Sequence, residues 1–165
     1  MASYLLKEYQ TLVVGILGFT GVILTLFTNA RLNRKQHTRQ IEHERTALKA
    51  ALSIELSIIR DAFRDRIETI GNTTGTPGMW VPVDTMTDAY SRLIDKIGLL
   101  SREQVNLVMR AYLLIRAVPE RLRLMGGLHA TRAGYLWVSS EHVGDARRMH
   151  ENFIGDIERA IAAVQ

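Results

Sequence analysis

Residues 9–30 read YQTLVVGILGFTGVILTLFTNA, a run of 22 residues without a charged side chain. A helix of this length spans about 33 Å, which is enough to cross the hydrocarbon core of a bilayer. A helix buried in a soluble core rarely needs so long an uncharged run. Tyr9 and Gln10 at one end and Asn29 at the other suit the two membrane interfaces. The sequence therefore predicts a transmembrane anchor within residues 1–30.

A cleaved signal peptide is the alternative, with Thr28-Asn29-Ala30 as a small-x-small cleavage site. The region before the apolar run has no positive excess, however, because Lys7 is followed by Glu8. The region after it is rich in arginine and lysine, which cross a membrane poorly. We therefore expect an anchor that is not cleaved.

The flanking charges predict the orientation of the anchor. Five basic side chains lie within fifteen residues after it, namely Arg31, Arg34, Lys35, Arg39 and Arg45. The other flank has only Lys7 and the α-amino group. The positive-inside rule then places the N-terminus outside and the rest of the chain in the cytoplasm. We expect the first four of these cations to contact anionic lipid headgroups as well.

Small and polar residues recur along the anchor at steps of four and three. They are Thr11, Gly15, Gly18, Val22, Thr25 and Asn29. This spacing places them on one face of a helix. In lipid, close backbone approach and hydrogen bonds favour contacts between helices, whereas apolar bulk does not. The sequence contains no second candidate span, so the expected partner is a transmembrane helix of another copy or of a larger membrane complex.

Composition limits the chemistry that the chain can perform. The absence of cysteine excludes disulfides, thiolate metal sites and cysteine nucleophiles. A net charge of +4 and a pI near 9.7 raise nucleic acid as a partner. Much of the positive excess lies beside the apolar run and no nucleic-acid-binding motif is recognised, so lipid headgroups are the expected counter-charge. No cofactor or metal site is expected.

The residues after the anchor predict a helical stalk and then a bundle. Residues 31–47 are polar and basic, and no proline or glycine interrupts residues 22–70. Apolar residues then recur every three or four positions: Leu48, Leu52, Leu56, Ile59, Phe63, Ile67 and Ile70. This period indicates one helix that leaves the membrane and joins a cytoplasmic bundle of residues 48–165. The sequence GNTTGTPG at 71–78 should end it.

The middle of the chain predicts a packed connector and two helices. Met79–Val83 is apolar and should pack against the domain. Asp84 should cap a helix that runs to about Leu99 and turns Met86, Tyr90, Leu93 and Ile97 inward. Ser101 and Gln104 fit a capping box for the next helix. That helix should bury Val105, Val108, Tyr112 and Ile115, be kinked or divided at Pro119, and end at Gly126-Gly127.

The C-terminal part predicts one more long helix. Leu128–Val138 is a mixed segment that suggests a short helix. Ser139 or Ser140 should then cap a helix that buries Val143, Ala146, Phe153, Ile157, Ile161 and Val164. No segment shows sustained period-two alternation. We therefore expect an all-α fold, with one transmembrane helix continuing into a mostly antiparallel bundle.

Short motifs in the chain resemble those of small bacterial membrane proteins of unassigned function. The motifs are Ala51-Leu52-Ser53-Ile54-Glu55-Leu56, then Tyr90-x2-Leu93-x2-Lys96-Ile97-Gly98-Leu99-Leu100, followed by Val105, Val108 and Tyr112. Those proteins share one N-terminal span, a basic stalk and a helical bundle. The resemblance implies a bacterial cell-membrane protein of this plan, and it implies no activity.

Candidate catalytic residues are few. His37 and His43 lie in the polar stalk, and His150 lies near the apolar stripe of the last helix. Arg123 and His129 match the loose arginine–histidine spacing of HEPN ribonucleases, but Leu124 replaces the polar residue usual after the arginine. Glu55 and the pairs Arg60-Asp61 and Arg64-Asp65 fit a solvated helix face.

These observations favour a non-enzymatic, membrane-anchored interaction or accessory subunit. One alternative is a homo-oligomeric pore lined by Thr11, Thr25 and Asn29, a plan with precedent in a CRISPR-associated pore that joins one span to a HEPN-like bundle. The other alternative is an anchored ribonuclease that uses Arg123 and His129.

Overall fold

The computed structural model describes residues 2–72, 77–82, 86–126 and 134–165. Side chains are described for Tyr9 and from Val14 onward within these ranges, except at residue 126. The chain divides into two compact units, Met1–His43 and Glu44–Gln165. Most of the described residues are helical, as the sequence predicts.

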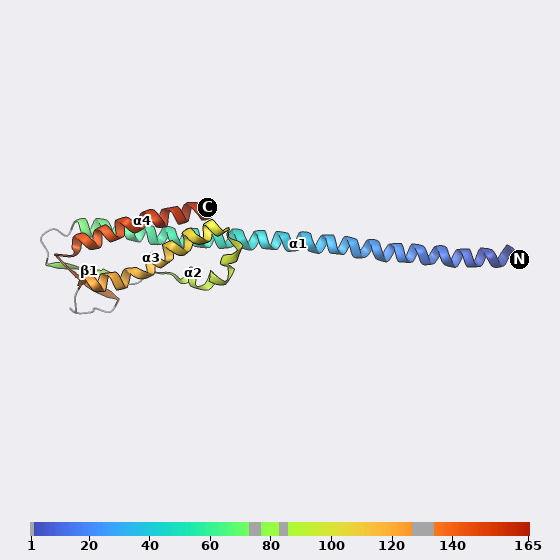
Figure 1. Cartoon of the computed structure of the whole chain (residues 1–165), viewed down its shortest axis with the longest axis horizontal. Coiled ribbons are helices and arrows are strands. Elements are labelled where there is room, and N and C mark those ends of the chain that lie inside the picture. The colour runs from blue at the N-terminus through green and yellow to red at the C-terminus, as the bar shows by residue number, and fades with distance from the viewer. Residues whose placement is uncertain (1, 73–76, 83–85, 127–133) are drawn as a thin grey trace. The chain divides into compact units, whose positions relative to one another are not determined.

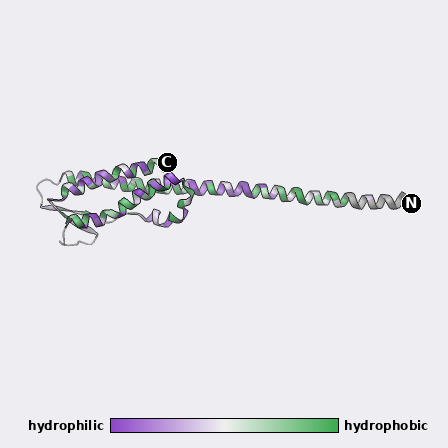
Figure 2. Cartoon of the chain, in the orientation of Figure 1, coloured by the Kyte–Doolittle hydropathy of each residue, from purple (hydrophilic) through white to green (hydrophobic). Residues whose placement is uncertain are grey.

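The first element is a single long helix, α1 (Ala2–Gly71). No glycine or proline breaks it between positions 22 and 70, which explains its length. Its N-terminal part is long and apolar enough to cross a membrane, and the apolar window there is not buried. Figure 2 shows the change along α1 from apolar residues to a hydrophilic stretch.

The second unit builds its core from the C-terminal part of α1, from α3 (Arg102–Gly126) and from α4 (Val143–Val164) (Figure 1). The expected stripe of α1 is buried at Leu48, Leu52, Leu56, Ile59, Phe63 and Ile70. The expected inner residues of α3 and α4 are also buried, except that Val105 and Val143 are half-buried. The helical period of the sequence thus identified the faces that pack.

A two-stranded antiparallel sheet adds to the helices an element that the sequence did not predict. Strand β1 (Gly78–Pro82) pairs with β2 (Tyr135–Ser139), with Trp80 opposite Trp137. Val81 and Val138 are fully buried on the inner face, so the apolar connector packs as predicted. The short helix predicted within 128–138 is wrong where the structure describes it, because residues 135–138 are in β2. Residues 128–133 lie outside the described ranges.

The segment after the sheet is shorter and less regular than predicted. Helix α2 (Asp88–Leu93) passes directly into a 3-10 helix, η1 (Ile94–Leu99). The predicted cap, Asp84, lies outside the described residues. Met86 was expected to face inward, but it precedes the helix, has a positive φ of 42° and exposes 60% of its surface. Tyr90 is buried as predicted.

The helix boundaries test three further predictions. The capping box is confirmed, since the Ser101 and Gln104 side chains each accept a hydrogen bond from the other's backbone N–H. Pro119 does not divide α3, because a proline removes only one hydrogen bond of a long and otherwise packed helix. Neither Ser139 nor Ser140 caps α4. Ser139 ends β2, and His142 precedes the helix without a side-chain cap.

Candidate functional site

The uncharged part of α1 lies exposed within the first unit. From Val14 to Ala30 every side chain is exposed except that of Ile23, which is intermediate. The buried hydrophobic cluster of the described residues begins only at Leu48. Phe19 and Phe27 expose 68% and 72% of their surface. A continuous exposed surface of apolar side chains is typical of a segment that contacts lipid or another protein.

The predicted packing face is open along the described part of α1. A Cβ added at Gly15 or Gly18 meets nothing within 4 Å. Val22 and Asn29 are exposed, and the side chain of Thr11 lies outside the described residues. The Thr25 hydroxyl donates to the Gly21 carbonyl at 2.8 Å. This hydroxyl therefore already has an acceptor in the backbone of its own helix, one turn earlier.

The four cations predicted to contact lipid headgroups, Arg31, Arg34, Lys35 and Arg39, follow the apolar run on α1. All four side chains are exposed. Exposed guanidinium and ammonium groups at this position can reach phosphate oxygens at a bilayer surface. Contact of these cations with lipid headgroups stays a prediction.

The second unit contains a buried polar cluster at Glu55. Its Oε1 accepts a hydrogen bond from the Ala89 N–H at 2.7 Å. Its Oε2 accepts from the Tyr90 N–H at 3.0 Å and from the Tyr112 hydroxyl at 2.5 Å. The Tyr90 and Tyr112 rings stack with centroids 3.9 Å apart. Burial and the bond to Glu55 raise the pKa of Tyr112, which keeps its hydroxyl protonated as a donor.

Glu55 caps α2 from another helix. The residue before α2, Thr87, makes no side-chain cap, and the first N–H groups of a helix have no partner within it. The Glu55 carboxylate takes the N–H groups of the second and third residues of α2. The expectation that Glu55 faces solvent is therefore wrong. The helical spacing of the sequence could have indicated this burial. Glu55 lies three residues after Leu52 and four before Ile59, which places it beside the buried stripe of α1.

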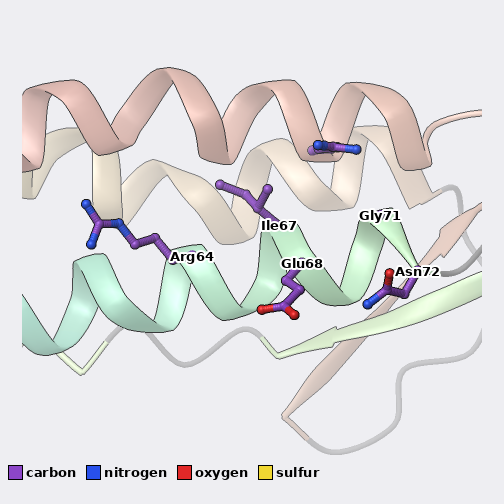
Figure 3. Close-up of a pocket in the computed structure, with 6 residues that line it drawn as sticks. Arg64, Ile67, Glu68, Gly71 and Asn72 are labelled. Atoms are coloured by element: carbon purple, nitrogen blue, oxygen red, sulfur yellow. The ribbon is translucent and has the colours of Figure 1, made fainter.

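A shallow surface groove of about 400 Å³ lies where α1 and α4 meet. It is lined by Arg64, Ile67, Glu68, Gly71, Asn72 and Arg147 (Figure 3). Arg64 binds the Glu158 carboxylate at 2.5 Å, and Arg147 binds Glu151 at 2.8 Å. Both guanidinium groups of the groove thus have carboxylate partners, and the pair of Arg64 and Glu158 joins α1 to α4.

Asp61, Arg64 and Asp65 lie on the exposed surface of α1, as predicted, but Arg64 contacts Asp61 and not the expected Asp65. Arg60 binds Asp61 at 2.8 Å, and Arg64 lies 4.0 Å from Asp61 across one helical turn. Exposed pairs of this kind contribute little to stability.

The histidines show no catalytic arrangement in the described part of the chain. His37 and His43 are exposed, whereas His150 is fully buried in α4 against the Phe63 ring. Arg123 is exposed and pairs with Glu120 at 3.2 Å, while His129 lies outside the described residues. The ribonuclease pair therefore stays untested. The described residues contain no group of three potential metal ligands.

The fold and these clusters define a mostly helical chain with one helix that could cross a membrane. No protein-family model, curated protein or solved structure matches the chain. The resemblance to small bacterial membrane proteins thus stays a prediction.

Proposed function

We propose that this chain is a single-pass protein of the bacterial cell membrane that serves as a non-enzymatic interaction or accessory subunit of a membrane assembly. Residues 9–30 anchor it with the N-terminus outside. The second unit is a helical bundle in the cytoplasm that carries contacts for assembly. The face from Thr11 to Asn29 packs against another transmembrane helix.

One observation carries this proposal: the exposed and uncharged surface of α1 between Val14 and Ala30. In water such a surface is unfavourable by about 25 cal/mol for each Å² of apolar area. A bilayer removes that cost and also accepts the backbone, because every peptide group of a helix bonds within the helix. The cations that follow from Arg31 to Arg39 support the orientation.

The character of the second unit supports an interaction role over catalysis. Its best-formed buried polar cluster uses the Glu55 carboxylate to hold the start of α2, so all three described donors serve the fold. The groove between α1 and α4 likewise pairs its arginines with carboxylates.

Two measurements test the proposal. The chain should stay with membranes after an alkaline carbonate wash, because an integral helix is not released by charge disruption. In mild detergent, the native mass should exceed that of the 18.6 kDa chain, through further subunits or copies. Release by carbonate would overturn the anchor, and a purely monomeric species would overturn the subunit role. A conducting ring of identical copies would favour a pore lined by Thr11, Thr25 and Asn29.

A further inference from the structure

Helix α3 exposes two leucines on the side that faces away from the core. Leu113 and Leu124 expose 64% and 79% of their surface, and Leu124 is the most exposed large apolar side chain that the structure describes. At about 100° per residue, the two leucines lie within about 20° of each other around the helix. They are opposite the buried stripe of α3, which runs from Val108 to Leu122. The second unit therefore leaves this face of α3 uncovered.

The residues of this face have the spacing of a helix that pairs with another helix. Leu113, Ala117, Glu120 and Leu124 are separated by steps of four, three and four, which are the steps between the contact positions of a coiled coil. Ala117 is small and half-buried, so it leaves room between the two leucines for a side chain of a partner. The spacing indicates a contact with one helix rather than with a flat surface.

Arginines flank this line of contact positions on both sides. Arg116 and Arg123 each precede a contact position, and Arg121 follows one, so the three occupy the flanking positions of the heptad. All three side chains are exposed. The Arg121 guanidinium lies 5.1 Å from the centroid of the Phe153 ring on α4, which holds it at the edge of the face. Charges at flanking positions decide which helix can pair.

Positive charge is concentrated on α3, although the second unit as a whole is almost neutral. Residues 44–165 carry 16 arginine and lysine side chains and 15 aspartates and glutamates, whereas the exposed side chains of α3 include five arginines and two glutamates. Arg110 binds Asp156 of α4 at 3.1 Å and lies outside the line of contact positions. Glu120 and Arg123 are 3.2 Å apart and both more than half exposed, so a carboxylate of a partner can replace this weak pair. The charge of the face therefore favours an acidic partner.

A second copy of the chain does not fit this face, because it presents the same arginines. In a parallel pair, Arg116 would face Arg121 of the copy, and in an antiparallel pair arginine would again face arginine. Like charges at such distances repel. A helix with carboxylates at its own flanking positions forms ion pairs with the same arginines.

We propose that α3 binds an acidic amphipathic helix of another protein through a leucine–arginine face, which comprises Leu113, Arg116, Ala117, Arg121, Arg123 and Leu124. The leucines pack into the apolar stripe of that helix, and the arginines bind carboxylates on either side of the stripe. Leu113 and Leu124 are about 16 Å apart along α3, so the partner needs at least three helical turns. This inference names the partner class of the proposed function, and it rests on that function in one respect, that the second unit carries contacts for assembly.

Peptide binding to the full-length chain in phosphatidylcholine nanodiscs tests the leucine–arginine face. The probe is a labelled synthetic helix of three heptads, with leucine at the contact positions and glutamate at the flanking positions. A matched peptide has lysine in place of the glutamates, and empty nanodiscs give the background of each. Fluorescence anisotropy should show that the glutamate peptide binds at least about tenfold more tightly than the lysine peptide. Equal binding of the two peptides, or none above background, would overturn the proposal.

Charge reversal within the face gives the sharpest test. Arg116→Glu should weaken binding of the glutamate peptide by about tenfold and strengthen binding of the lysine peptide, because the same position then attracts the opposite charge. Arg148→Glu on α4 is the matched control, since it makes the same change in net charge at a side chain that is 74% exposed. It should leave both affinities unchanged. An equal effect of the two variants would assign the binding to overall charge and overturn the proposal.

The leucines are tested separately from the charges. Leu113→Ser with Leu124→Ser should weaken the glutamate peptide by at least about tenfold, with an unchanged melting temperature because both side chains are exposed. Ile54→Ser on α1 is the control, since Ile54 is 63% exposed against 64% for Leu113, and it should bind as the unmodified chain does. Undiminished binding in the leucine variant would overturn the face. Displacement of the peptide by phosphatidylserine vesicles, as complete as by unlabelled peptide, would assign the face to an anionic lipid surface and overturn a protein partner.

The proposed function fails or stands by different measurements. If no peptide binds but the chain resists carbonate and keeps further subunits, the leucine–arginine face is overturned and the proposed function stands. If the glutamate peptide binds as expected but carbonate releases the chain, the membrane anchor is overturned and the binding face stands.

Discussion

At the residue scale, Glu55 links three elements of the second unit. One carboxylate on α1 accepts two N–H groups of α2 and the hydroxyl of Tyr112 on α3. A buried carboxylate is costly unless hydrogen bonds satisfy its oxygens. These three bonds compensate for the burial, and they also position α2 against α1 and α3.

Replacing Tyr112 by phenylalanine removes one of those donors. We expect Tyr112→Phe to lower the free energy of unfolding by about 1.5–3 kcal/mol, because the lost bond is to a charged group. Urea unfolding of the full chain in mild detergent measures it. Tyr90→Phe is the matched control, since the Tyr90 hydroxyl donates to the neutral sulfur of Met109. An equal loss in both variants would show that Glu55 is not the important acceptor.

His150 should make stability depend on pH. Burial lowers the pKa of His150, and the positive charge of Arg66 lowers it further. The contact of its Nδ1 with the Ala146 carbonyl, at 2.7 Å, opposes this shift without reversing it. Below the unfolded pKa of about 6.5, the unfolded chain gains a proton that the folded chain does not. Stability should therefore fall as pH drops from 7 to 5, by up to about 1.4 kcal/mol per pH unit.

The free energy of unfolding at several pH values measures this effect. His150→Gln should flatten the pH dependence, whereas His37→Gln, at an exposed stalk position, should not change it. A wild-type profile that His150→Gln leaves unchanged would assign the dependence to other groups.

At the element scale, the two-stranded sheet depends on close contact between its strands. Trp80 and Trp137 meet edge to face, with centroids 5.2 Å apart. Gly78 has a φ of +155°, and a Cβ there would lie 2.4 Å from the Val138 carbonyl oxygen and 2.6 Å from the Trp137 ring. Only glycine allows this approach.

Gly78→Ala should therefore separate the strands. We expect a loss of roughly 1–3 kcal/mol in the free energy of unfolding, because the backbone conformation and the contact are both unfavourable for alanine. The tryptophan near-UV circular dichroism should weaken with it. Gly155→Ala on α4 is the control, since nothing lies within 4 Å of its added Cβ and alanine favours a helix. Unchanged circular dichroism in Gly78→Ala would show that the close contact of Gly78 with Val138 and Trp137 is not needed for the pairing of the strands.

The uncharged segment of α1 allows a similar test of the proposed membrane contact, with glycines. Gly15→Leu with Gly18→Leu should reduce association in a membrane two-hybrid assay, because leucine separates the helix backbones while remaining favourable in lipid. Gly21→Leu, which lies off the face, should have less effect. Undiminished association in the double variant would remove this face as a contact and leave the second unit as the contact surface.

At the scale of the whole molecule, charge asymmetry sets the expected orientation. A reporter fused after Gln165 should be active only in the cytoplasm, because the cations after the apolar run resist translocation. Replacing Arg31, Arg34, Lys35 and Arg39 together should weaken or invert this preference. Alkaline phosphatase activity of the unmodified fusion in the periplasm would overturn the assignment.

The sequence predicted correctly those features that depend only on residues near one another within one helix. The apolar period predicted the buried residues of α1, α3 and α4, and the capping box at Ser101 needed only four adjacent residues. It failed where two distant segments meet. Five-residue strands such as Gly78–Pro82 and Tyr135–Ser139 carry too few alternations to be recognised alone, and pairing across more than fifty residues stabilises them.

The sequence by itself determined the long α1, its uncharged segment and the basic residues beside it, because helical period and charge are local properties of the chain. Only the tertiary structure decided that Glu55 is buried, that α2 starts where it does, and that a sheet lies beside the helices. Each of those depends on a partner more than thirty residues away. A buried carboxylate and a short strand are unfavourable alone, and they become stable only when folding brings their hydrogen-bond partners to them.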